Sequence, residues 1–162
     1  MVSYRLLLGI VVGIAFSFFT AFFFNMEEII IQLQLYSQID VLKFIIILIG
    51  ANFKFDLFSI FTGSSTIIAF FAPQLLASIF IGYLSGTISK GLKRGLIASF
   101  LVIIIDILIW MLLSVISGED LMALFQGTQL SVTIGGIITA LIGAIIGGLI
   151  GGVISGPYEE VY

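Results

Sequence analysis

The feature that most constrains this chain is a set of apolar stretches long enough to cross a lipid bilayer. Crossing the ~30 Å hydrocarbon core takes about 20 apolar residues in a helix. Three stretches of that length carry no charge, Leu6–Asn25, Thr66–Ser89 and Ser131–Tyr158, and a fourth, Gly95–Gly118, carries only Asp106. Apolar residues occupy every face of these stretches, whereas the strands of a membrane β-barrel alternate polar and apolar residues. The runs therefore predict membrane-spanning α-helices.

The amino-acid composition leads to the same class of protein. Only 9% of the 162 residues are charged and 60% are hydrophobic, whereas a soluble domain carries about 25% charged residues. We predict an all-α integral membrane protein, a single membrane domain of residues 1–162 built as a four-helix transmembrane bundle with a long apolar outer loop between its first two helices. The expected spans are Leu6–Phe24, Thr66–Ile88, Gly95–Ser117 and Thr133–Ser155. The first is longer than the apolar part of a signal peptide and has no small-residue cleavage site, so we expect a retained anchor.

The basic residues predict how the helices are oriented. Arg5 precedes the first span, and Lys90, Lys93 and Arg94 lie in the short loop between the second and the third. Lysine and arginine flanking membrane helices concentrate on the cytoplasmic side. An even number of crossings must therefore separate the two groups, which the four-helix arrangement provides. We expect a multi-pass protein of the cell membrane with both termini cytoplasmic and the 25–65 and 118–132 loops outside.

Residues 41–61 of the outer loop are apolar enough to suggest a fifth span. Lys43, Asn52, Lys54 and Asp56 interrupt this segment, however, and a full crossing here would place Arg5 and the other basic group on opposite sides. We interpret the segment as an interfacial or re-entrant element. The alternation of polar and aromatic residues over 52–57 is equally compatible with a short strand.

Small residues recur at four-residue spacing along the last span, where they form two adjacent columns on one side of the helix. Such columns allow the close van der Waals contact through which helices associate in lipid. The first span shows the same spacing at Gly9 and Gly13. Two interpretations remain open: the first and last helices pack together, or the last helix binds another copy or another membrane protein. The two columns are Gly136, Ala140, Ala144, Gly148, Gly152, Gly156 and Gly135, Thr139, Gly143, Gly147, Gly151, Ser155.

The second and last spans resemble each other. Leu75–Ser89 aligns without gaps with Leu141–Ser155 and matches Gly82 to Gly148 and Gly86 to Gly152. This alignment suggests a duplicated helical hairpin, in which both segments run from the outside to the inside. Internal repeats of this kind are common in transporters.

A family resemblance rests on part of the same region. Pro73–Leu101 contains Gly82-Tyr83-Leu84-Ser85-Gly86, a short basic turn and Gly91–Gly95. This pattern resembles small archaeal four-helix membrane proteins with a GYLAG-type hairpin, and the glycine-rich last helix is similar as well. The resemblance covers about half of the chain and implies the four-helix architecture, with no activity attached. Asp106 and the long 25–65 loop depart from the family pattern.

Asp106 is the most informative single residue, because it lies midway along the third span, about 16 Å from either end. A carboxylate at this depth is costly and is a functional candidate by default. Its helix face also carries Gly95, Ser99, Trp110 and Ser117, so we expect it to point into the bundle. We predict a protonated Asp106 that donates a hydrogen bond to Gln74 of the second span. This pair is a structural bond between helices, a proton or sodium site, or half of a contact between subunits.

The sequence excludes several chemistries. It contains no histidine and no cysteine, which excludes His-based triads, cysteine nucleophiles and ordinary zinc or iron–sulfur sites. We therefore expect no enzyme activity, no cofactor and no metal.

The net charge of −3 does not suggest a nucleic-acid partner. The partners that we expect are the lipid bilayer and either further copies of the chain or other membrane proteins. We predict a structural or accessory membrane subunit that associates through its small-residue helix faces; the alternative is a channel or transporter for protons or sodium that uses Asp106.

Overall fold

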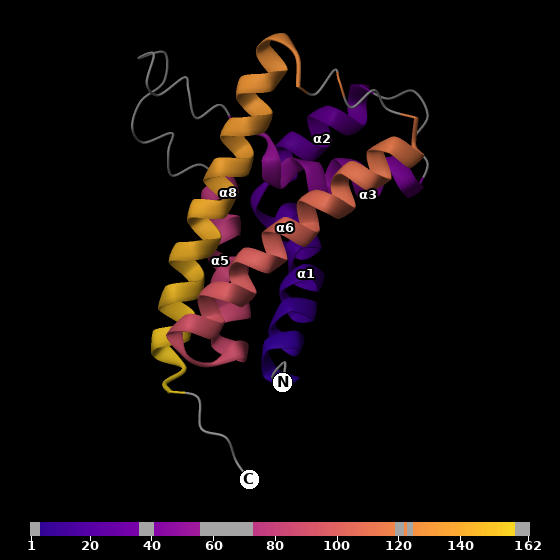
Figure 1. Ribbon diagram of the computed structural model, residues 1–162. Coiled ribbons are helices and arrows are strands. Elements are labelled where there is room, and N and C mark those ends of the chain that lie inside the picture. The colour runs from indigo at the N-terminus through magenta and orange to yellow at the C-terminus, as the bar shows by residue number, and fades with distance from the viewer. Residues whose placement is uncertain (1–3, 36–40, 56–72, 119–121, 123–124, 158–162) are drawn as a thin grey trace.

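The computed structural model describes residues 4–35, 41–55, 73–118, 122 and 125–157, and Figure 1 shows its path. Every regular element in these ranges is a helix, so the all-helical prediction is confirmed for the described residues. The elements are α1 (Tyr4–Phe24), α2 (Met26–Leu35), α3 (Val41–Gly50), the 3-10 turn η1 (Ala51–Phe53), α5 (Pro73–Ser89), α6 (Leu92–Ile116) and α8 (Gly127–Ile154).

Three of these helices, α1, α6 and α8, are long and apolar enough to cross a membrane. They contain 21, 25 and 28 residues, and their bounds agree with the predicted spans to within a few residues, except that α8 begins earlier. The described part of α5 has 17 residues, about 25 Å at 1.5 Å per residue. The first seven residues of the span predicted at 66–88 lie outside the described residues.

Helices α5 and α6 lie between α1 and α8. Helix α8 packs along α5 and also against α6, while α1 packs against the other sides of α5 and α6. The prediction that the first and last helices pack together is therefore wrong. Periodicity had identified the small-residue face of each helix correctly, but a face does not specify which helix will cover it.

The contacts between the helices give their directions. Gly9 near the start of α1 lies against Ser89 at the end of α5, and Gly95 near the start of α6 lies against Gly152 near the end of α8. Helices α1 and α6 therefore run one way, and α5 and α8 the other, as Figure 1 shows. The parallel course predicted for the two similar segments in α5 and α8 is confirmed.

The four basic residues used to predict orientation lie at one end of the bundle. Arg5 is in the first turn of α1, and the other three flank the tight turn between α5 and α6. In that turn Lys90 and Gly91 both have positive φ, 50° and 85°, and glycine adopts this conformation without strain. We call this the basic end; its residues are Arg5, Lys90, Lys93 and Arg94.

The described part of the segment predicted as interfacial or re-entrant forms α3 and η1. Helix α3 has 10 residues, about 15 Å, which is half the length needed for a crossing. Its second half and η1, Ile46 to Phe53, are buried. They pack against α1 and α6, and η1 also contacts α5 and α8. Asn52 and Phe53 lie in a 3-10 turn, so the strand alternative is wrong for these two residues. Residues 56–61 lie outside the described part of the chain, and the interfacial or re-entrant interpretation stays a prediction.

Candidate functional site

Asp106 lies near the middle of α6 with only 2% of its surface exposed. Gly95, Ser99 and Trp110 of the same helix face are buried with it, and Ser117 at the end of the helix is half-buried. The Trp110 ring lies 5.7 Å from the Phe53 ring between centroids and packs on Gly50. The α3–η1 segment thus covers the outer part of the helix face on which Asp106 lies.

The side chain that hydrogen-bonds the Asp106 carboxyl is Ser17 of α1. The Ser17 hydroxyl also donates to the carbonyl oxygen of Ile14 at 2.7 Å. A serine hydroxyl has one proton to donate. The single proton of Ser17 can therefore go to the Ile14 carbonyl oxygen or to the Asp106 carboxyl, but not to both at once. The second carboxyl oxygen, Oδ1, has no partner among the described residues.

Two buried asparagines extend the polar contacts from Ser17 toward the other end of the bundle. Asn52 of η1 donates through Nδ2 to the Ser17 carbonyl oxygen at 3.3 Å. Asn25, between α1 and α2, donates through Nδ2 to Asn52 Oδ1 at 3.0 Å. Each of these asparagines is 3% exposed. We call Asp106, Ser17, Asn52 and Asn25 the polar run.

The polar run ends beside a pocket at the end of the bundle opposite the basic end. This polar pocket has a volume of about 320 Å³ and is lined by Phe24, Asn25, Glu27, Ile31, Pro73 and Gln74. Asn25 Oδ1 is buried and has no hydrogen-bond partner among the described residues.

The structure does not pair Gln74 with Asp106. Gln74 lies at the start of α5, in the wall of the polar pocket, whereas Ser17 bonds the carboxyl. The predicted Asp106–Gln74 bond is therefore wrong.

On the side toward the basic end, glycines bring three helices into backbone contact. A Cβ atom on Gly86 of α5 or on Gly95 of α6 would lie 2.6 Å from the Gly148 carbonyl oxygen of α8. Such distances allow no side chain between the helices. We call Gly86, Gly95 and Gly148 the glycine node.

Eight of the ten glycines predicted to pack helices lie in described contacts with other segments of this chain. One column of α8 contacts α5, the other contacts α5, α6 and η1, and the two glycines of α1 contact α5 and α6. Of the remaining two, Gly135 is buried, and Gly156 lies past the end of α8 with a positive φ and nothing within 4 Å of a Cβ. The contacting residues are Gly143, Gly147 and Gly151 with α5; Gly148 and Gly152 with α6; Gly136 with η1; and Gly9 and Gly13 in α1.

Sequence reasoning did not identify Asn25 and Asn52 as members of the site. Both are amides at the edge of an apolar run, and that position is the only sequence signal they carry. No group of three acids in the described part of the chain is arranged to hold a metal ion.

Comparisons with models of protein families, with curated proteins and with solved structures found no match to this chain. The resemblance to archaeal four-helix membrane proteins therefore stays a prediction, and the function must be argued from the site itself.

Proposed function

We propose that this chain is a four-pass membrane protein, with α5 as the fourth crossing beside α1, α6 and α8. Support comes from the pairing of α5 with α8. Gly143, Gly147 and Gly151 lie in turn against Leu75, Ile79 and Tyr83, so α5 follows a membrane-length helix along its whole described length. The basic end is then cytoplasmic, and the polar pocket opens on the outer side.

We further propose that the protein takes up a proton at Asp106 through the polar run. The observation that carries this proposal is the run of polar contacts that leads inward from the polar pocket. Asn25 donates to Asn52, Asn52 donates to the backbone carbonyl of Ser17, and the Ser17 side chain bonds the buried carboxyl. Intramembrane carboxyls with polar relays are the usual elements of proton pathways.

A proton fits the site better than sodium does. A protonated carboxyl can donate to the Ser17 hydroxyl while that hydroxyl donates to the Ile14 carbonyl oxygen, 2.7 Å away. A bare cation, by contrast, needs several oxygen ligands around it, and Ser17 is the one side chain in the described residues that bonds Asp106. The glycine node closes the route toward the basic end, so we propose a gated proton site rather than an open pore.

Proton flux into vesicles tests this proposal. The purified protein is reconstituted with a pH-sensitive dye inside, and a pH gradient is applied across the membrane. We expect flux that Asp106→Asn abolishes and that Asn52→Leu lowers. Ser114→Ala is the matched control, because Ser114 is another buried polar residue of α6 and makes no contact with the polar run among the hydrogen bonds described.

Infrared spectroscopy gives a second readout that does not depend on transport. A protonated carboxyl has a carbonyl stretching band that asparagine lacks, so Asp106→Asn should remove one such band from the spectrum of the folded protein. Unchanged flux together with an unchanged spectrum in this variant would rule out Asp106 as the proton site.

An accessory subunit is the second candidate, and one observation favours it. Helix α6 extends obliquely away from α8 at its far end (Figure 1), and the side chains there are more than half exposed: Leu108, Leu112, Val115 and Ile116. This face is free of the glycine contacts and could receive a partner helix. Native mass spectrometry after gentle extraction should then show a complex of fixed stoichiometry, whereas a monomer without partners would contradict this candidate.

A further inference from the structure

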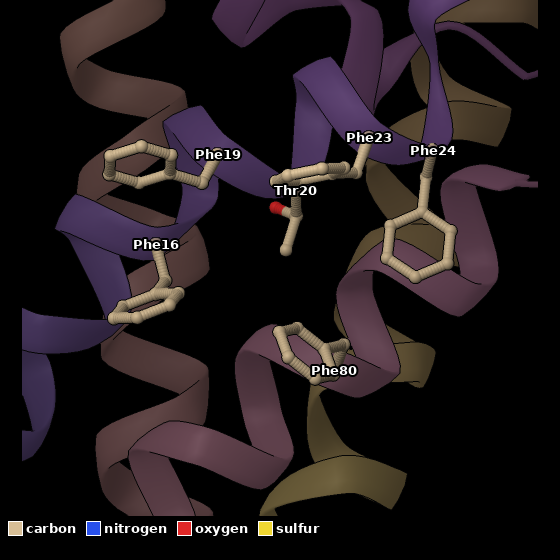
Figure 2. Close-up of a pocket in the computed structure, with 6 residues that line it drawn as sticks. All are labelled: Phe16, Phe19, Thr20, Phe23, Phe24 and Phe80. Atoms are coloured by element: carbon tan, nitrogen blue, oxygen red, sulfur yellow. The ribbon is translucent and has the colours of Figure 1, made fainter.

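A second cavity lies between α1 and α5 on the outer surface of the bundle. Its volume is about 470 Å³, and it is lined by Phe16, Phe19, Thr20, Phe23, Phe24 and Phe80. Figure 2 shows the five aromatic rings around one open space, five of the six residues coming from α1 and Phe80 from α5. We call this cavity the phenylalanine groove. Its lining offers no polar surface, since the Thr20 hydroxyl is bonded to the Ser17 carbonyl oxygen at 2.9 Å.

The phenylalanine groove adjoins the polar pocket. Phe24 lines both cavities, and its ring lies 6.3 Å from that of Phe80. An apolar groove alone would accept any lipid chain, because hydrophobic contact is not directional. A polar pocket beside the groove also selects the ligand by the chemistry of its polar head group.

The residues around the polar pocket accept hydrogen bonds. Glu27 is an exposed carboxylate, and Gln74 lines the pocket with an amide that can accept as well as donate. The third acceptor is Asn25 Oδ1, which is buried without a partner while Nδ2 of the same amide is bonded to Asn52. Glu27 is the one charged residue among the described residues that line the pocket. A ligand head group that suits these residues donates hydrogen bonds and carries positive charge. A phosphate head group would instead be repelled by the Glu27 carboxylate, and no cation lines the described part of the pocket to offset the repulsion.

We propose that the phenylalanine groove and the polar pocket form one binding site for a long-chain primary ammonium amphiphile. Its chain lies against the rings of α1 and α5, and its ammonium group donates its three N–H bonds toward Glu27, Asn25 and Gln74. The face of an aromatic ring such as Phe24 also attracts a cation. This inference rests on the proposed membrane placement, because the ligand would enter from the bilayer. It shares the polar pocket and Asn25 with the proposed proton route, but it is tested separately from proton uptake at Asp106.

Photolabelling with three matched probes tests the site. The probes are hexadecylamine, hexadecanol and hexadecyl phosphate, each with the same photoreactive group in its chain, added to the full-length protein in phosphatidylcholine vesicles. We expect the amine to label α1 and α5 peptides about tenfold more than the phosphate does, because charge-assisted hydrogen bonds differ from unpaired charges by at least that factor. The labelled peptides are located by mass spectrometry.

Two variants separate the roles of the head and the chain. Glu27→Lys, at an exposed position, should reverse the preference so that the phosphate probe labels more than the amine. Phe80→Ala should reduce labelling by every probe. Its control is Phe100→Ala on α6, because Phe80 and Phe100 are 40% and 41% exposed and Phe100 does not line the groove. Circular dichroism verifies that each variant is folded.

Three results would overturn the proposal: equal labelling by all three probes, an unchanged preference in Glu27→Lys, or undiminished labelling in Phe80→Ala. Stronger labelling by the alcohol than by the amine would assign the site to a neutral amphiphile and also contradict it. If labelling is not selective but proton flux is intact, the proposed function still holds. If labelling is selective but there is no proton flux, the amphiphile site still holds.

Discussion

At the scale of single residues, Asn52 holds the polar run together. It comes from η1, outside the long helices, yet its side chain contacts the Ser17 carbonyl oxygen and the Asn25 amide. Burying an amide among apolar helices is costly unless its groups are bonded. One residue thus fixes the position of η1 and completes the route from the polar pocket to Asp106.

We predict that Asn52→Leu destabilises the protein by about 2 kcal/mol, because the Asn25 donor is then buried without a partner. Thermal unfolding in detergent, followed by circular dichroism, measures the loss. Gln129→Leu replaces an exposed amide of α8 and should leave the unfolding midpoint unchanged. Equal midpoints for the two variants would mean that the bonds of Asn52 contribute little.

The glycine node leads to a second prediction at this scale. A methyl group on Gly86 would lie 2.6 Å from the backbone oxygen of Gly148, and backbone cannot move aside as a side chain can. We expect Gly86→Ala to cost about 1–3 kcal/mol, the usual penalty of overpacking. Leu76→Ala, at a 43% exposed position of the same helix, is the control, and the same unfolding assay compares them. A stable Gly86→Ala variant would show that α5 and α8 can separate at little cost.

At the scale of elements, the α3–η1 segment depends on α8 for its position. The Phe53 carbonyl packs directly on Gly136, where any Cβ would overlap it, and the Phe55 amide donates to the Val132 carbonyl oxygen at 3.3 Å. A short helix and a turn are stable inside the bundle because α1, α5, α6 and α8 all contact them.

Gly136→Val should therefore displace η1 while leaving the α5–α8 pair intact. We expect faster hydrogen exchange in peptides covering residues 41–55 and unchanged exchange near Gly147, which lies on the far part of α8. Ile142→Val, at a 38% exposed position of the same helix, serves as the control. Unchanged exchange over 41–55 would mean that Gly136 does not seat the turn.

The pairing of α5 with α8 gives physical meaning to the similarity of their sequences. Gly82 aligns with Gly148 and lies against Ala144, one turn away. The two similar segments thus pack side by side, in parallel and at nearly equal depth. Duplication of a hairpin stays a prediction, but the small residues that suggested it are the residues that bring the two helices together.

At the scale of the whole molecule, the alternating helix directions place the four residues of the basic end on one side of the bundle and the polar pocket on the other. The chain has no cysteine, so single cysteines can report sidedness without background labelling. We predict that Lys93→Cys and Pro157→Cys react with an impermeant maleimide only from the cytoplasmic side, and that Glu27→Cys and Gln126→Cys react only from outside. Labelling of Lys93→Cys and Gln126→Cys from the same side would show that α6 does not cross.

The sequence by itself determined the long helices α1, α6 and α8 and their buried faces. Long apolar runs must form helices in lipid, and periodicity places Asp106 and the glycine columns on inward faces. Helices α2 and α3 were not predicted, and the orientation that charge bias indicates stays a prediction. Only the tertiary structure decided what covers each face: α5 and α6 against the glycines of α8, Ser17 rather than Gln74 beside Asp106, and Asn52 inserted from an irregular segment. The reason is physical. Periodicity fixes rotation and depth within one helix, whereas the identity of the neighbour depends on how all the helices pack at once.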